Sequence, residues 1–305
     1  MRFSNLLMAA IGVSVLASAP VAAQDLTGTL KKVKDSGVIS IGHRDSSVPF
    51  SYFDDKQQVV GYAQDICMKL ADAVKTELGL PKLEVKLIPI TSATRIPLMA
   101  NGTIDIECGS TTNNLERQKQ VSFTYTHFVT ANRFISKKAN NYKTLEDLKG
   151  KTVVSTAGTS NIKQLTQLNN EKNLGMTILP AKDHAEAFLM VETDRAAAFV
   201  MDDILMASLA ANSKTPDNYV ISEDALSVEP YGSMIRKDDA PFKKVIDTAM
   251  GKMFSDGTVT ALYDKWFMKP IPPKGITLNI PMSAELKKVV EHPTDSGDPN
   301  DYKVN

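Results

Sequence analysis

The sequence of 305 residues predicts an α/β protein of two lobes, built on mostly parallel sheets and joined by a two-strand hinge. Strand-like runs alternate with helical runs, which is the pattern of α/β units with parallel strands. The alternation stops twice, at the long extended runs 122–138 and 226–237. Because a complete second α/β series lies between these runs, we expect the chain to enter a second lobe through one and return through the other.

The first predicted lobe opens with a buried strand and a long amphipathic helix. Residues 38–43 (VISIGH) are typical of such a strand. Within residues 61–79, Ile66 and Leu70 fall on one helical face, and Gly79 ends the helix. The next expected elements are a strand at 83–90, a short helix at 94–102 and a strand at 103–108.

Residues 109–119 (GSTTNNLERQK) follow this last strand and contain more small polar residues than a turn requires. Asn113 and Glu116 have the spacing of a capping box. We therefore expect a helix here, with Arg117 just inside its first turn.

The second predicted lobe repeats the α/β pattern. Its expected elements are a helical turn at 144–150, strands at 151–158, 177–182 and 196–202, and helices at 159–175, 184–195 and 203–213. Helical segments that end at 264–267 (DKWF) then complete the first lobe.

These elements define the expected domains. Lobe 1 comprises 24–130 and 232–280, lobe 2 comprises 131–231, and the hinge strands lie near 126–135 and 226–234. The tail, 281–305, is polar and follows a proline-rich stretch, so we expect it either to wrap the surface or to be disordered.

Residues 1–23 have the composition of a cleavable secretory signal, with Arg2, an apolar run and small residues before Gln24. A membrane anchor is the alternative, but Pro20 interrupts a run that is already too short to span a bilayer. We therefore expect the protein to be exported to a bacterial periplasm.

The formal net charge is 0, so a nucleic-acid partner is not expected. The sequence has no P-loop, GxSxG, HExxH or CxxC motif, and we expect no cofactor, no metal and no catalytic residue. Cys67 and Cys108 are the two cysteines. In an oxidising compartment they are expected to form a disulfide, the alternative being two buried thiols.

Polar residues recur where the predicted strands end, the edge at which open α/β sheets bind ligands. Arg44, Arg95 and Arg117 each follow a strand, and the last two begin helices, where the helix dipole disfavours a base. Each could instead be a surface arginine, and Arg117 could pair with Glu116. Their recurrence at equivalent positions favours an anion-binding site.

The second lobe adds helix starts at Thr159-Ser160 and Asp183-His184, whose free backbone N–H groups could bind an anion. Thr159 and Asp183 could equally be ordinary N-caps. At a helix start His184 is expected to be a neutral imidazole that donates a hydrogen bond. Asp203 is expected to cap the helix that it begins, which leaves Asp202 free to bind a cation.

Three arginines and one free aspartate would suit a ligand with two carboxylates and one ammonium group. An acidic amino acid has this set of charges.

Several motifs also carry a family resemblance. The runs NGTIDIECGSTTNNLERQKQVSFT, KGKTVVSTAGTS and AFVMDD resemble the periplasmic solute-binding proteins of ABC transporters for polar amino acids. Within that family, the chain is similar to the glutamate/aspartate-binding branch. The runs that carry this similarity are GHRDSSVPFSY, PITSATRIPL, AKDH, and RKDD with DKWF and PIPP. The resemblance implies the type II periplasmic binding protein fold.

The resemblance also implies a role for each site residue. The α-carboxylate of the ligand would be bound by Ser110, Thr112 and Arg117, and its ammonium group by Asp202. Arg44, Ser92, Arg95 and His184 would form the side-chain pocket, with Ser160 at the anion-binding helix start. Many relatives have an aromatic residue at the position of Ser47, so Phe50 or Tyr52 would have to cover the ligand instead.

The implied function is a monomeric receptor that closes on L-glutamate or L-aspartate and delivers it to an ABC permease in the inner membrane. Two alternatives use the same fold. One is a dehydratase-like enzyme acting on prephenate or arogenate, and the other is a sensory protein that presents its ligand to a receptor.

Overall fold

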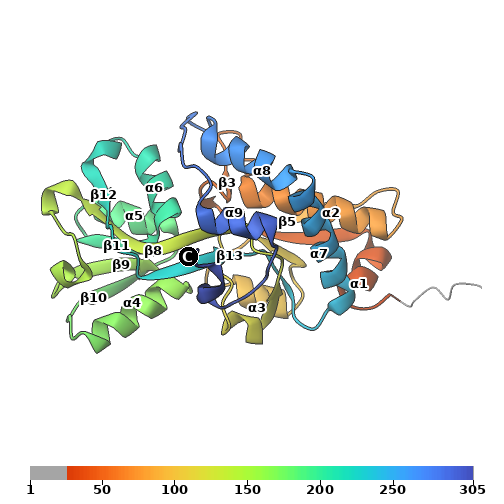
Figure 1. Ribbon diagram of the computed structural model, residues 1–305, viewed down its shortest axis with the longest axis horizontal. Helices are drawn as coiled ribbons and strands as arrows, with labels where there is room; N and C mark the ends of the chain where they lie inside the picture. The colour runs from red at the N-terminus through yellow and green to blue at the C-terminus, as the bar shows by residue number, and fades with distance from the viewer. Residues whose placement is uncertain (1–25, 305) are drawn as a thin grey trace, which may run out of the picture.

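The computed structural model describes residues 26–304 and shows two α/β lobes side by side, with the chain crossing between them at the middle of the molecule (Figure 1). The expected signal segment, residues 1–23, lies outside the described residues. Within residues 26–304 no helix has the length and apolar character needed to cross a membrane.

The first lobe is built on a sheet with the strand order β5-β1-β6-β14-β7. Its strands are β1 (Val38–His43), β5 (Glu84–Pro89), β6 (Ile106–Cys108), β7 (Val121–Phe123) and β14 (Met234–Arg236). Its helices and turns are α1 (Gly28–Ser36), α2 (Tyr62–Glu77), α3 (Arg95–Ala100), η1 (Arg117–Lys119), α7 (Ala240–Ser255), α8 (Thr258–Tyr263) and η5 (Asp264–Met268). A small separate sheet contains β2 (Ser46–Ser47), β3 (Ser51–Phe53) and β4 (Val59–Val60).

The second lobe is built on a sheet with the order β10-β9-β11-β8-β12, and β13 also pairs with β8. Its strands are β8 (Phe128–Lys137), β9 (Thr152–Thr156), β10 (Thr177–Ala181), β11 (Ala198–Asp202), β12 (Tyr219–Ile221) and β13 (Ser227–Tyr231). Its helices and turns are η2 (Lys138–Asn140), η3 (Leu145–Leu148), α4 (Ser160–Glu171), α5 (His184–Glu192), α6 (Asp203–Asn212) and η4 (Pro216–Asn218).

Each large sheet is mixed. In the first lobe β1 pairs in parallel with β5 and β6, and in the second β9 pairs in parallel with β10 and β11. Strands β8, β13 and β14 pair antiparallel to their neighbours, because they belong to the segments that carry the chain out of the first lobe and back. The parallel strands bring their carboxyl ends, and the polar residues that follow them, to one edge of each sheet.

Helix α2 forms as its sequence predicts. Ile66, Leu70 and Val74 are fully buried at helical spacing, and Gly79 follows the helix with a φ of +57°. The predicted disulfide is present: Cys67 of α2 is bonded to Cys108 at the end of β6. The bond therefore fixes α2 to the strand that leads into residues 109–119.

The two extended runs of the sequence contain β8 and β13, which pair antiparallel with Phe128 opposite Tyr231. The first run is interrupted at residues 124–127, between β7 and β8. Phe50 packs edge-on against both Phe128 and Tyr231, with ring centroids 4.9 and 5.1 Å apart. The crossing between the lobes is thus anchored in an aromatic core.

The C-terminal segment is ordered and wraps the surface, which was one of the two expectations. It contains α9 (Ala284–Glu291) and η6 (Pro299–Tyr302), and Tyr302 is fully buried. Figure 1 shows α9 lying over the middle of the molecule beside β13.

The prediction of a helix that begins after Asn113 is wrong. Residues 112–113 are extended instead, because Thr112 forms a β-bridge with Tyr231 and the Asn113 backbone donates to the Pro230 carbonyl at 2.7 Å. A short 3₁₀ turn begins only at Arg117. The capping box with Glu116 is therefore absent, and the Asn113 side chain turns toward the C-terminal segment.

Candidate functional site

Three buried arginines form the centre of the candidate site, at the edge where the strands of the first lobe end. Arg44 follows β1, Arg95 begins α3 and Arg117 begins the 3₁₀ turn η1. Their exposed fractions are 2%, 1% and 7%. Burial of this much positive charge is unfavourable without nearby negative charge, which favours an anionic ligand here.

The pKa values of the three arginines are lowered because the side chains are buried close together. Burial lowers the pKa of Arg44 to about 10 and that of Arg117 to about 9, and the charge of Arg95 acts in the same direction on both. Burial also lowers the pKa of Arg95 itself. The pKa values of Arg44 and Arg117 still lie above neutral pH, so both side chains remain cationic.

Several buried donors of this site have no hydrogen-bond partner among residues 26–304. They are Arg44 Nη1, Arg95 Nε, Ser92 Oγ and Ser110 Oγ. Buried polar atoms are normally paired, because an unpaired donor loses its hydration without compensation. These donors are therefore available to oxygen atoms of a ligand.

Other groups hold the arginines in place. Arg95 Nη1 donates to Thr111 Oγ1 at 2.5 Å, and Arg117 Nη1 donates to the Thr112 carbonyl at 2.8 Å. Thr112 lies in the β-bridge to Tyr231 of β13. The predicted carboxylate-binding residues are thus tied to the strand that connects the lobes.

The second lobe contributes His184, the first residue of α5. Its Nδ1 lies 2.8 Å from Thr156 Oγ1, and its Nε2 lies 3.5 Å from Arg44 Nη2. Burial, followed by the charges of Arg44 and Arg95, holds the pKa of His184 well below its usual range. The imidazole is therefore neutral, as expected, but toward Arg44 it accepts rather than donates, because a guanidinium can only donate.

Asp202 ends β11 and is buried, with 2% of its surface exposed. Its carboxylate accepts hydrogen bonds from Asn161 Nδ2, at 2.7 Å, and from the Tyr231 hydroxyl. Burial raises the pKa of Asp202 to about 7, and the nearby Glu229 carboxylate acts in the same direction. A cation bound beside it would favour the ionised form.

The other helix-start residues have structural roles. Thr159 caps α4 by accepting from the Ile162 backbone, and Asp183 caps α5 by accepting from the Glu186 backbone. Asp203 was expected to cap α6, and this is wrong. Its carboxylate instead accepts from Thr130 Oγ1 at 2.6 Å and pairs with Arg133 Nε at 3.1 Å.

The two lobes touch around the site. Arg117 Nη2 donates to the Gly158 carbonyl at 3.4 Å, and the hydroxyl oxygens of Ser160 and Thr112 lie 3.4 Å apart. Glu116, expected as an alternative partner of Arg117, pairs with Lys163 of the other lobe. A pocket of about 460 Å³ opens beside these contacts, lined by both lobes. Of the predicted site residues, Arg44 and His184 are in contact across the lobe interface, and so are Thr112 and Ser160.

Sequence reasoning missed two acids of the site. Glu107 is fully buried in β6, and an added Cβ on Gly109 would lie 2.5 Å from Glu107 Oε1 and 2.9 Å from Arg44 Cγ. Glu229 of β13 accepts from Ser160 Oγ at 2.9 Å. Glu107 could have been noticed as an acid inside the strand-like run TIDIEC. Glu229 could not, because its extended run has no alternation of apolar and polar residues that assigns it to a buried face.

The two aromatic residues that were expected to cover the ligand both have contacts within the protein. Phe50 is buried in the aromatic core at the crossing, and the Tyr52 hydroxyl donates to the Pro272 carbonyl at 2.7 Å. Tyr231, which donates to Asp202, is the aromatic residue that directly contacts a predicted ligand-binding side chain.

Comparison with known proteins identifies the relatives of this chain. Residues 39–269 match the model of the bacterial extracellular solute-binding proteins, family 3. The L-glutamate/L-aspartate-binding protein of Pseudomonas aeruginosa is 52% identical, with coverage of 97% of this chain and 98% of the relative. The glutamate/aspartate import solute-binding protein of Escherichia coli is 49% identical, with coverage of 92% and 93%.

Solved structures show the same architecture. A mutant of the arginine-binding protein ArgBP from T. maritima superposes with a TM-score of 0.69 at 27% identity, over 78% of this chain and 98% of that one. The family match ends at residue 269, so the C-terminal segment lies beyond it.

Proposed function

The chain belongs to the bacterial extracellular solute-binding proteins of family 3, and on that premise we propose that it binds L-glutamate and L-aspartate for import. The observation that carries the proposal is the group of three buried arginines, with unpaired donors on Arg44 and Arg95, facing Asp202 across the lobe interface. An acidic amino acid supplies two carboxylates for the former and one ammonium for the latter. The relatives of about half identity are glutamate/aspartate-binding and import proteins, not enzymes.

The proposed roles follow the two ends of such a ligand. Ser110, Thr112 and Arg117 bind its α-carboxylate, Asp202 binds its ammonium group, and Ser160 supports the interface. The side-chain carboxylate is bound by Arg44, Ser92, Arg95 and His184. A ligand with a cationic side chain would bring a further positive charge against buried arginines, so the charges of the pocket oppose it.

Closure completes the site, because lobe 1 supplies the arginines and lobe 2 supplies Asp202. In this proposal lobe 1 (24–130 and 232–280) and lobe 2 (131–231) rotate about the hinge strands near 126–135 and 226–234. Ligand contacts to both lobes favour the closed state by their differential affinity.

The cellular role proposed for the protein is delivery. Residues 1–23 direct its export to the periplasm, where it acts as a monomer and passes its ligand to an ABC permease in the inner membrane. The family membership and the import role of the relatives support this assignment.

One calorimetric panel tests the function. Purified protein is titrated with glutamate, aspartate, glutamine, asparagine, histidine and arginine. We expect glutamate and aspartate to bind at least about a hundredfold more tightly than their amides, because each amide leaves buried cationic donors without a charged partner. Tight binding of arginine or histidine, with none of glutamate, would disprove the assignment.

A further inference from the structure

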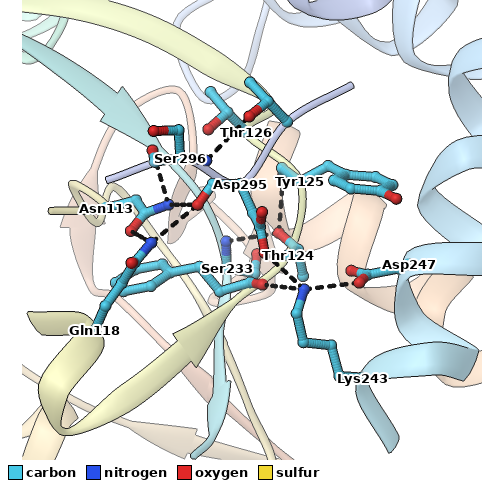
Figure 2. A network of polar contacts seen from close by, with 12 residues as sticks. Asn113, Gln118, Thr124, Tyr125, Thr126, Ser233, Lys243, Asp247, Asp295 and Ser296 are labelled. Atoms are coloured by element: carbon cyan, nitrogen blue, oxygen red, sulfur yellow. Dashed lines mark hydrogen bonds and ion pairs between the residues drawn. The ribbon is translucent and has the colours of Figure 1, made fainter. Parts of the chain in front are cut away.

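The C-terminal segment contacts the predicted carboxylate-binding loop directly (Figure 2). We call residues 109–119 the carboxylate loop and residues 294–297 the C-terminal anchor. Asn113 Nδ2 donates to the Asp295 carbonyl at 2.7 Å and to the Ser296 carbonyl at 3.2 Å. Gln118 Nε2 donates to the same Asp295 carbonyl at 2.9 Å and to Asn113 Oδ1 at 2.9 Å. Two amides of the loop are therefore held by the backbone of the anchor.

The anchor is itself fixed to the first lobe. The Asp295 carboxylate pairs with Lys243 of α7 at 2.8 Å, and Lys243 also pairs with Asp247 at 2.7 Å. The Thr294 carbonyl accepts from the Thr126 backbone at 2.8 Å. The side chain of Asp295 is thus fixed by Lys243 of the first lobe, while its backbone carbonyl accepts the hydrogen bonds from the carboxylate loop.

Gly297 allows the anchor to lie flat against the loop. A Cβ added at this position would lie 2.8 Å from both the carbonyl carbon of Asn114 and the backbone nitrogen of Leu115. Real Cβ atoms do not approach backbone atoms so closely, so any larger residue must push the anchor and the loop apart.

The loop has little structure of its own to hold it. Its only helical part, η1, spans three residues, which is too short to be stable by itself. Asn113 is fully buried, and its side-chain bonds go to the anchor and to Gln118. Its neighbour Thr112 accepts the hydrogen bond from Arg117, and Asn114 accepts from the Arg117 backbone at 2.9 Å.

We propose that the C-terminal anchor is a positioning element for the carboxylate loop, which sets the affinity for the α-carboxylate of the ligand. This inference rests on the proposed function. The anchor lies beyond the family match, which ends at residue 269, whereas the match to the P. aeruginosa protein covers 97% of the chain and so extends well past that point. The anchor therefore lies outside the family match, in the C-terminal part of the chain.

The first test uses Gly297→Ala in the full chain, with Asn300→Ala as control. Asn300 is exposed in the same C-terminal segment, and its side chain bonds only to Asp298. Calorimetry at 25 °C should show glutamate binding about tenfold weaker in Gly297→Ala, the effect of losing one or two well-placed hydrogen bonds. Asn300→Ala should bind like the wild type. Lys243→Met, which releases the anchor without entering the loop, should act like Gly297→Ala.

Two hydroxyl deletions distinguish an effect of the anchor on the carboxylate loop from a general loss of order in the site. Thr112→Val removes a group at the proposed α-carboxylate end, and Ser92→Ala removes one at the side-chain end. If the anchor acts through the loop, Gly297→Ala should still cost about tenfold in the Ser92→Ala background but no more than about threefold in the Thr112→Val background. Melting temperatures of all variants report stability independently.

Three results would overturn the proposal. The first is a lower melting temperature for Gly297→Ala and Lys243→Met with unchanged glutamate affinity, which would make the anchor purely structural. The second is an equal loss in both hydroxyl-deletion backgrounds. The third is a wild-type protein that binds no acidic amino acid, which would also remove the proposed function, whereas the first two leave that function intact.

Discussion

Arg117 is buried where the two lobes meet. Its guanidinium donates to Thr112 within its own lobe and to Gly158 of the other. Both partners are backbone carbonyls, so no protein carboxylate bonded to Arg117 competes with that of a ligand.

We therefore expect Arg117→Ala to weaken glutamate binding more than a hundredfold, because a buried carboxylate that loses its partner costs about 3–5 kcal/mol. Titration calorimetry measures the change. Arg195→Ala is the matched control and should bind normally, since Arg195 is an exposed arginine that precedes the amino end of β11, whereas the site lies at the carboxyl end of that strand. Near-normal affinity in Arg117→Ala would contradict the proposed role.

Asp202 gives the binding a defined pH dependence. Burial raises its pKa to about 7. The ligand's ammonium group needs the ionised carboxylate, so binding releases the proton when Asp202 is protonated. Affinity should therefore fall as pH decreases below about 7, by up to about tenfold per unit.

Glutamate titrations between pH 5.5 and pH 7.5 check this prediction, because the ligand's own carboxyl groups stay ionised in that range. The same carboxyl affects folding with the opposite sign. Without ligand, a raised acid pKa makes stability decrease as pH rises toward about 7. Asp202→Asn should bind weakly at every pH and lose the dependence; a variant that keeps the wild-type slope would show that another group titrates.

At the scale of elements, Gly158 is where the second lobe approaches the first. It follows β9 with a φ of +77°, and an added Cβ would lie 2.5 Å from the Ala93 Cα. The lobes can touch here because the residue has no side chain.

Gly158→Ala should weaken glutamate binding by at least about tenfold, because it obstructs closure, while its effect on stability should be that of one strained residue, about 1 kcal/mol. Gly175→Ala is the matched control. Its φ is +60°, but no atom lies within 4 Å of the added Cβ. Calorimetry and thermal melts of both variants should differ only in binding; equal binding in the two would contradict the role of Gly158 in closure.

The disulfide links α2 to β6 across 41 residues of sequence. The chain-entropy model gives a loop of this length a stabilisation of about 4 kcal/mol. Urea denaturation of Cys67→Ala/Cys108→Ala should show a decrease of that order in the free energy of unfolding. The reduced wild type should lose a similar amount. A loss below about 1 kcal/mol would mean that packing alone holds these elements together.

How far the sequence predicts the site depends on the element that carries each residue. Arg44, Arg95, His184 and Asp202 were predicted because each lies at the end of a strand with a clear pattern or shortly after it. Glu229 and Tyr231 were missed because their segment is a crossing strand, whose partners are set by tertiary pairing and not by local periodicity.

The error at Asn113 has the same cause. Its spacing to Glu116 matches a capping box, but the backbone of this segment pairs with the chain returning from the other lobe. Long-range pairing therefore outweighed a local signal worth only about 1 kcal/mol. The role of the C-terminal segment could not be predicted either, because its contacts to the loop are made largely by backbone carbonyls.

At the scale of the whole molecule, the predicted ligand-binding groups are divided between the lobes. The buried arginines come from the first lobe, whereas His184 and Asp202 come from the second. A ligand that contacts both groups shifts the molecule toward the closed form by the free energy of the contacts that only this form allows.

Small-angle scattering should accordingly show a smaller radius of gyration when glutamate is added to the wild-type protein. Gly158→Ala should remain more open at the same ligand concentration. An identical radius of gyration for the free and glutamate-saturated wild type would mean that binding does not depend on closure.

The disulfide between Cys67 and Cys108 also determines when the structure of the first lobe is completed. Such bonds form where thiols are oxidised and are rare in a reducing cytoplasm. Cys108 directly precedes Gly109, so the carboxylate loop gains its covalent support only once the bond exists. A newly made chain in a reducing compartment would therefore lack this link between α2 and the strand that leads into the loop, and the link is completed only where thiols are oxidised.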